Sequence, residues 1–155
     1  MTSTVITRER PDHPDAIALI AELEAHLAGI YPVESRHGFS VQKLLNEGVA
    51  FFVLRAEGRP AGCGGVLLVG RDYAELKRLY VRPEFRGRRF GEQLVERLAA
   101  HARAHGIHLL RLETGSEQRQ ATRLYERLGF HVIPPFGPYR EDGHSLCYEK
   151  SLAPE

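Results

Sequence analysis

The spacing of apolar and polar residues changes along the chain, and these changes divide the first half into elements. Residues 4–10, TVITRER, alternate between apolar and polar positions as a strand does. Residues 12–29 change to helical spacing, which places four apolar side chains on one face: Ile17, Ile20, Leu23 and Leu27. The pattern predicts a strand followed by a helix that buries this face.

Three strand candidates follow a short helical stretch around Leu44. They cover residues 49–56, 60–70 and 73–81. The first two are separated by EGR, whose Gly58 favours a tight hairpin. These segments predict an antiparallel meander.

The second half of the chain begins with a helical stripe of apolar residues: Phe90, Leu94, Val95, Leu98, Ala99 and Ala102. Residues 107–114 have the pattern of a buried strand, 116–129 that of a second helix, and 130–133 and 144–152 that of two last strands. The chain contains no internal repeat or linker. We therefore predict one α+β domain over residues 1–155.

Composition and charge narrow the possible partners. The 155 residues include 21 Lys and Arg against 20 Asp and Glu, a formal net charge of +1, which favours neither nucleic acid nor a membrane surface as partner. Cys63 and Cys147 form no CxxC motif, and the longest apolar runs are far shorter than the ~20 residues that span a bilayer. These features predict a cytoplasmic protein.

Residues 82–94, RPEFRGRRFGEQL, concentrate positive charge between the third strand of the meander and the stripe helix. The first N–H groups of a helix lack internal partners, and glycines allow a ligand to approach the backbone closely. Such a helix end attracts phosphate, and arginine side chains add charge-assisted bonds. The turn therefore predicts a site for a phosphorylated ligand; the alternative is a loop whose arginines face water.

The stretch LYVRPEFRGRRFGEQLVERL resembles the acyl-CoA-binding motif of the GNAT superfamily of N-acyltransferases, in which Arg or Gln is followed by two residues, Gly, one residue, and Gly or Ala. Arg86 and Gly91 match the ends of this motif, and Arg89 stands at its central glycine. Downstream, QRQATRLYERLGF is similar to the second motif of the family, with Gln118 at the Asn position. The order of strands and helices agrees with the family over almost the whole chain.

The resemblance implies the GNAT fold, a mixed and mostly antiparallel central sheet with helices on both faces. It also implies direct transfer of an acetyl group from acetyl-CoA to an amine. The pantetheine arm would pair with the backbone of Leu79 and Val81 as an added strand, residues 86–91 would hold the pyrophosphate, and a backbone N–H freed by a bulge near Leu79 would meet the oxyanion. The implied cofactor-binding residues are Leu79, Tyr80, Val81, Arg86, Gly87, Arg88, Arg89, Phe90, Gly91 and Gln118.

Two residues are candidates for proton transfer. Glu75 corresponds by position to the carboxylate that many members of the family carry on the strand before the pyrophosphate turn, and we expect it to be the general base. By the two-residue alternation Glu75 and Leu79 share a strand face about 13 Å apart, so we expect a bridging water. The alternative is a surface carboxylate paired with Lys77 or Arg78.

Tyr125 is the candidate acid, because the Leu-Tyr motif implies a phenol that donates to the departing thiolate. Its alternative is a core aromatic residue on the helix stripe. His101 and His105 lie one helical turn apart without an apparent third ligand, so no metal site is predicted.

The acceptor site is expected between residues 34–39 and the late loop 134–139, PPFGPY. The candidate substrate-binding residues are Arg36, His37, Arg78, Phe136 and Tyr139. Arg36, His37 and Arg78 would suit the carboxylate of an amino acid or a similar small amine.

We therefore expect N-acetylation of a small-molecule amine, with a possible homodimer left open. One alternative is a protein or peptide acetyltransferase acting on N-termini or lysines. The other is an acyl-CoA-binding module without catalysis.

Overall fold

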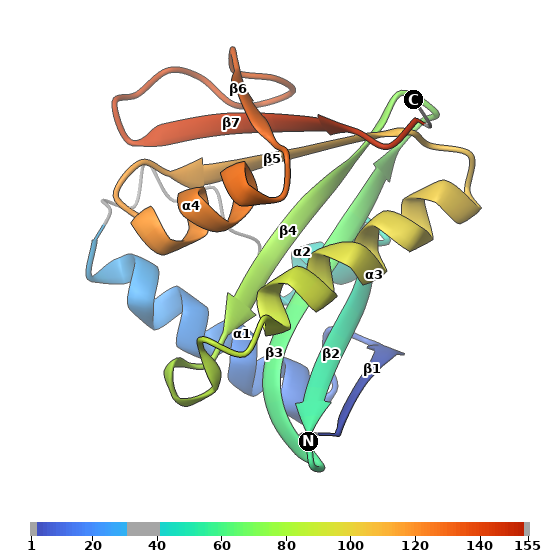
Figure 1. Ribbon diagram of the computed structural model, residues 1–155, viewed down its shortest axis with the longest axis vertical. Coiled ribbons are helices and arrows are strands. Elements are labelled where there is room, and N and C mark those ends of the chain that lie inside the picture. Colours follow the sequence, from blue (N-terminus) through green and yellow to red (C-terminus); the bar gives the residue numbers. More distant parts are fainter. Residues whose placement is uncertain (1–2, 31–40, 154–155) are drawn as a thin grey trace.

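The computed structural model describes residues 3–30 and 41–153, and in these ranges seven strands form one sheet (Figure 1). Their order across the sheet is β1-β2-β3-β4-β5-β7-β6. The strands are β1 (Thr4–Glu9), β2 (Ala50–Ala56), β3 (Arg59–Val69), β4 (Tyr73–Val81), β5 (Leu109–Gly115), β6 (His131–Ile133) and β7 (Ser145–Ser151). All neighbouring strands are antiparallel except β4 and β5, which are parallel.

The parallel pair β4 and β5 separates after a short paired stretch. Only Ala74, Glu75 and Leu76 of β4 pair with β5, opposite residues 110–112. The remainder of β4, residues 77–81, is bonded to β3 alone, and Figure 1 shows the two strands diverging. The sheet is therefore open at one end between two of its central strands.

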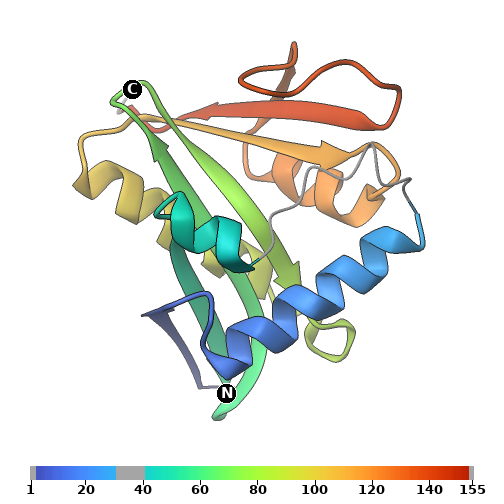
Figure 2. The ribbon, with the colours of Figure 1, turned by 180° about the vertical axis from the view of Figure 1, so that it is seen from behind.

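Helices cover both faces of the sheet, as the resemblance implies. Figure 1 shows α3 (Phe90–Ala104) and α4 (Arg119–Arg127) on one face, and Figure 2 shows α1 (Pro14–Ala28) and α2 (Val41–Asn46) on the other. The prediction of a mixed, mostly antiparallel sheet between two helical layers is confirmed. No helix in residues 3–30 or 41–153 is long and apolar enough to span a bilayer.

The stripe predicted for the third helix is confirmed, since all six of its apolar residues are buried. Two glycines of β3 let α3 lie close to the sheet. A Cβ atom on Gly64 would stand 3.1 Å from Leu98 of α3, and one on Gly62 would stand 3.2 Å from Leu94 of the same helix. This close contact fixes where α3 begins relative to β4.

The face predicted for α1 is partly wrong. Ile20 and Leu23 are buried as expected, but Ile17 is 45% exposed and Ala16 and Leu19 are buried in its place. The periodicity is correct and its phase is shifted, because the helix packs on the sheet through Ala16 and Leu19 rather than through Ile17.

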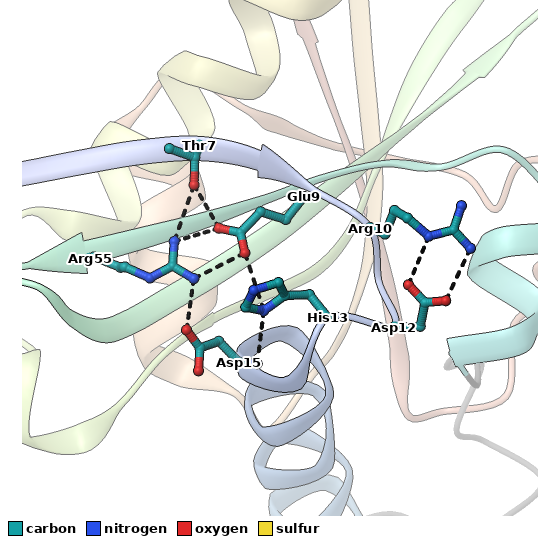
Figure 3. Close-up of polar contacts among 7 residues, drawn as sticks. All are labelled: Thr7, Glu9, Arg10, Asp12, His13, Asp15 and Arg55. Atoms are coloured by element: carbon teal, nitrogen blue, oxygen red, sulfur yellow. Dashed lines mark hydrogen bonds and ion pairs between the residues drawn. The ribbon is translucent and has the colours of Figure 1, made fainter.

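A polar network holds the beginning of α1 against β1 and β2 (Figure 3). Arg55 of β2 donates to both carboxylate oxygens of Glu9 and, at 2.7 Å, to Asp15. Thr7 donates to Glu9 at 2.6 Å, and His13 caps the helix by accepting from the N–H of Asp15. The guanidinium group holds the pKa of Glu9 below its ordinary value.

Candidate active site

Beyond Leu76 the edge of β4 that faces β5 is not paired with another strand. Arg82 donates its N–H to the carbonyl of Ala61 in β3 at 2.8 Å. Successive N–H groups of a regular strand point to opposite edges, so that of Val81 points away from β3, where no strand pairs with it. This edge can accept an extended ligand as an added strand, as predicted for the pantetheine arm.

The turn that follows β4 leads directly into α3. Gly87 has φ 84° and Arg89, at the N-cap of α3, has φ 62°, so both lie in the left-handed region. The first bond of the helix runs from the N–H of Gln93 to the carbonyl of Arg89 at 3.1 Å, and no side chain caps the helix. The N–H groups of Phe90 and Gly91 are therefore free to bind an anion.

The arginines of this turn are held in different ways. Arg86 donates from Nε to the carbonyl of Val81 at 3.1 Å, and the guanidinium of Arg88 lies 5.6 Å from the ring centroid of Phe85. Arg82 forms an ion pair with Glu22 of α1 at 2.7 Å, so it is not one of the arginines available to a phosphorylated ligand. Arg86, Arg88 and Arg89 are exposed, as an electrostatic site for a diphosphate requires.

Gly91 also lies close to α4. A Cβ atom at this position would stand 3.0 Å from the end of the Leu124 side chain, which would have to give by a few tenths of an ångström. The start of α3 and the middle of α4 thus lie side by side at the open end of the sheet.

On the α1 face of β4, opposite α3, Glu75 lies in a buried polar cluster with Lys77 and Tyr139. Lys77 Nζ is 2.8 Å from Glu75 Oε2 and 2.9 Å from the Tyr139 hydroxyl, which itself donates to Glu75. Burial lowers the pKa of Lys77, although Glu75 opposes that shift, and burial together with Glu75 raises the pKa of Tyr139. Glu75 is only 3% exposed, which differs from the surface carboxylate considered as its alternative.

The expectation that Glu75 and Leu79 share a strand face is wrong. Between Lys77 and Tyr80 the β3–β4 register shifts, because Arg78 and Leu79 together lie opposite Gly64, and Arg78 has φ 55°. This bulge reverses the alternation, so Leu79 packs against the core under α3 while Glu75 points to the α1 face. The bulge itself lies where the resemblance implies it.

The candidate carboxylate-binding residues are only partly within the described chain. Arg78 is buried on the α1 face and forms an ion pair with Glu24 of α1. Burial lowers its pKa to about 10. Arg36 and His37 lie outside the described residues.

The late loop between β6 and β7 is fastened against the sheet by aromatic residues. Phe136 and Tyr139 are both buried, and Phe136 packs edge-on against Tyr73 with ring centroids 5.5 Å apart. The guanidinium of Arg111 lies 4.6 Å from the Tyr73 ring centroid. Of the two loop residues predicted to contact the acceptor, only Tyr139 places a polar group in the cluster around Glu75.

Tyr125 lies on α4, within the core on the α3 side of the sheet. Its ring contacts those of Phe130 and Tyr148, and burial raises its pKa. Within residues 3–30 and 41–153 its hydroxyl group makes no hydrogen bond. The phenol is thus protonated and able to donate to a ligand.

Tyr80 and Gln118, both predicted to contact the cofactor, bond to other residues of the protein. Tyr80 points to the α1 face, where its hydroxyl lies 3.2 Å from Glu22, because the bulge places it on the side opposite Leu79. Gln118 stands at the N-cap position of α4, and its amide donates to the Thr114 hydroxyl at 3.4 Å.

Sequence reasoning missed Glu113, the first residue of β5 beyond its last pair with β4. Its carboxylate accepts a hydrogen bond from Ser145 at 2.6 Å and contributes to the raised pKa values of Tyr125 and Tyr139. Glu113 thus lies where β4 and β5 separate, one residue past their last pair. A lone carboxylate at the end of a buried strand was the signal that could have identified it.

The fold and the opening between β4 and β5 are those of an acyl-CoA-dependent transferase. Residues 12–130 match the model of the Acetyltransferase (GNAT) family, and the chain belongs to this family. It is an acetyl-CoA-dependent N-acetyltransferase.

Relatives and solved structures agree with this assignment. The chain is 40% identical to the IAA acetyltransferase of Azospirillum brasilense over 153 residues, 98% of this chain and 100% of that protein. A Klebsiella pneumoniae structure assigned as an acyl-CoA N-acyltransferase has a TM-score of 0.82 and 35% identity, covering 97% of this chain and 98% of that one. The PaiA N-acetyltransferase of Thermoplasma acidophilum, solved with coenzyme A, has a TM-score of 0.77 and 26% identity, covering 96% and 99%.

Proposed function

We propose that residues 1–155 form one acetyltransferase domain that acetylates a primary amine of a small molecule by direct transfer in a ternary complex. The main observation in favour of a small acceptor is the contact of Tyr139 with Glu75 and Lys77, which holds the loop 134–139 against β4. A peptide acceptor needs an open groove beside this loop, whereas a fastened loop suits a small acceptor. The Azospirillum brasilense relative is named as an IAA acetyltransferase, which supports a small-molecule acceptor.

The residues on the α3 side fit the cofactor. The free N–H groups of Phe90 and Gly91, with the exposed arginines of the turn, suit its diphosphate, and the open edge at Leu79 and Val81 suits its pantetheine arm. Bound acetyl-CoA supplies a thioester whose carbonyl carbon takes up the amine and whose sulfur departs. The N–H of Leu79, freed by the bulge, would stabilise charge on the carbonyl oxygen.

Two proton transfers accompany this exchange. The Tyr125 hydroxyl would donate to the departing sulfur from the α4 side. On the acceptor side Glu75 is buried below Tyr139, so it would receive the amine proton through a water molecule. Glu113 is the second carboxylate at the opening and the competing proton acceptor.

A panel experiment tests the acceptor class. The protein is incubated with acetyl-CoA, a thiol reagent and a set of small amines and peptides, and thiol release is followed. We expect release that depends on a small amine. Release only with peptides or proteins would favour the second enzyme function, and binding of coenzyme A without amine-dependent release would leave an acyl-CoA-binding module.

The same panel tests the carboxylate prediction for Arg78. Its ion pair with Glu24 already balances much of its charge, so an acceptor carboxylate would compete with Glu24. Matched amines with and without a carboxylate decide the point, and equal turnover of the two would remove the proposal. The cytoplasmic location stays a prediction, and the choice between monomer and homodimer stays open.

A further inference from the structure

Helix α4 carries three exposed arginines at intervals of four residues, Arg119, Arg123 and Arg127. Among residues 3–30 and 41–153 none of their guanidinium groups has a hydrogen-bond or ion-pair partner. Since the whole chain has a net charge of only +1, such an accumulation is local. These arginines add to the exposed positive charge of Arg86, Arg88 and Arg89 in the turn before α3.

The stability of the helix does not account for these arginines. Like charges four residues apart repel each other, and Arg119 at the first helical position faces the positive end of the helix dipole. The one acidic residue of α4, Glu126, accepts a hydrogen bond from Tyr148 of β7 at 2.9 Å. Arg127, in the last turn, is favoured by the helix dipole, but the repulsion among the arginines and the position of Arg119 cost the free protein stability, which an anionic ligand would offset.

Helix geometry shows on which side of α4 the arginines lie. Leu124 marks the flank of α4 that faces α3, because it lies against Gly91. At about 100° per residue, Arg127 lies about 60° from Leu124 around the helix axis and Arg123 about 100°. Glu126, by contrast, lies about 160° away, on the β7 side. Arg123 and Arg127 therefore flank the start of α3.

The chemistry of the cofactor supplies a matching anion. The ribose of coenzyme A that bears the diphosphate also carries a separate phosphate at its 3′ position. When the start of α3 holds the diphosphate, this third phosphate lies close by. A phosphate monoester has a charge of about −1.5 to −2 at pH 7, and guanidinium groups bind it in bidentate fashion. We propose that Arg123 and Arg127 form a subsite for the 3′-phosphate of coenzyme A.

Calorimetry with coenzyme A and with dephospho-coenzyme A, which lacks only this phosphate, tests the proposal without an acceptor or turnover. We expect the protein to bind coenzyme A at least tenfold more tightly. The double variant Arg123→Gln, Arg127→Gln should weaken coenzyme A binding about tenfold, leave dephospho-coenzyme A binding unchanged and reduce the salt dependence of binding. Arg103→Gln is the matched control, since Arg103 is also exposed and lies about 18 Å along α3 from Gly91.

Equal affinity of the unaltered protein for the two nucleotides would overturn the proposal. So would a variant that loses affinity for both nucleotides equally, or a loss in Arg103→Gln as large as that in the double variant. Because the measurement needs no amine, failure of the proposed acceptor class leaves it unaffected.

Discussion

The hydroxyl group of Tyr139 donates a hydrogen bond to Glu75 across 64 positions of sequence, and both residues are buried. Lys77 contacts both groups, so the late loop is joined to β4 by a small charged cluster. The contact links the wall of the acceptor side to the carboxylate predicted as base.

Tyr139→Phe removes this link. We expect a loss of about 1–3 kcal/mol in the free energy of unfolding, because Glu75 and Lys77 lose a buried partner. The KM for the acceptor should rise while the affinity for coenzyme A stays the same. Urea unfolding and steady-state kinetics measure both. Tyr73→Phe is the matched control, because the Tyr73 hydroxyl makes no hydrogen bond within the described part of the chain.

Glu75→Gln and Glu113→Gln separate the two candidate proton acceptors. If Glu75 is the base, its variant should lose about 10²–10⁴-fold in kcat and alter the pH dependence of the rate, with coenzyme A affinity intact. Glu113→Gln should then have the smaller effect. Unchanged kcat in Glu75→Gln would remove Glu75 from the mechanism, and a large loss in Glu113→Gln alone would transfer the role to Glu113.

Tyr125→Phe tests the acid. Since burial raises the pKa of Tyr125, its phenol stays protonated across neutral and mildly alkaline pH, and the rate should show no loss from its ionisation below about pH 10. The variant should turn over at least tenfold more slowly. Its stability should be nearly unchanged, because the hydroxyl has no partner in residues 3–30 and 41–153. A fully active variant would assign Tyr125 to packing alone.

Arg89→Gly should stabilise the protein slightly. At φ 62° a residue with a Cβ atom is strained by about 1–2 kcal/mol, while glycine costs about 0.5–1 kcal/mol in chain entropy. The expected net gain is about 0.5 kcal/mol in thermal or urea unfolding. Arg88→Gly is the control, because Arg88 has no positive φ and the same change there should destabilise.

Glu9→Gln tests the network that holds α1 in Figure 3. Since Arg55 lowers the folded-state pKa of Glu9 from 4.5, the pair stabilises the fold above pH 4.5, and this stabilisation is lost as the pH falls through the lower value. The variant should be about 1 kcal/mol less stable at pH 7, and the difference should vanish at acidic pH. Asp12→Asn, which breaks the exposed pair with Arg10 in the same figure, should have no measurable effect.

The predictions from sequence were best where a pattern is local. The stripe of α3, the positions of the strands along the chain and the arginine-rich turn all depend on residues within a few positions of one another. The face of α1 was partly wrong at Ile17, because a helix with apolar residues at 16, 17, 19, 20 and 23 has two possible apolar faces, and packing on the sheet selects one of them.

The candidate site was harder to predict because it depends on one irregularity and on distant contacts. The bulge at Arg78 places Glu75 and Leu79 on opposite faces, although uninterrupted alternation placed them together. The sequence did not indicate a role for Glu113, because the residues that it interacts with lie on β7 and α4, far from it in sequence.

The sequence by itself determined the family motifs, the helical and strand periods and the charge of the turn before α3, since each is encoded in neighbouring residues. Only the tertiary structure decided which carboxylates meet at the opening, that Tyr139 joins the late loop to β4, and that Arg123 and Arg127 flank the start of α3. Those relationships depend on strand register and helix packing, which are set by the whole core rather than by any short segment.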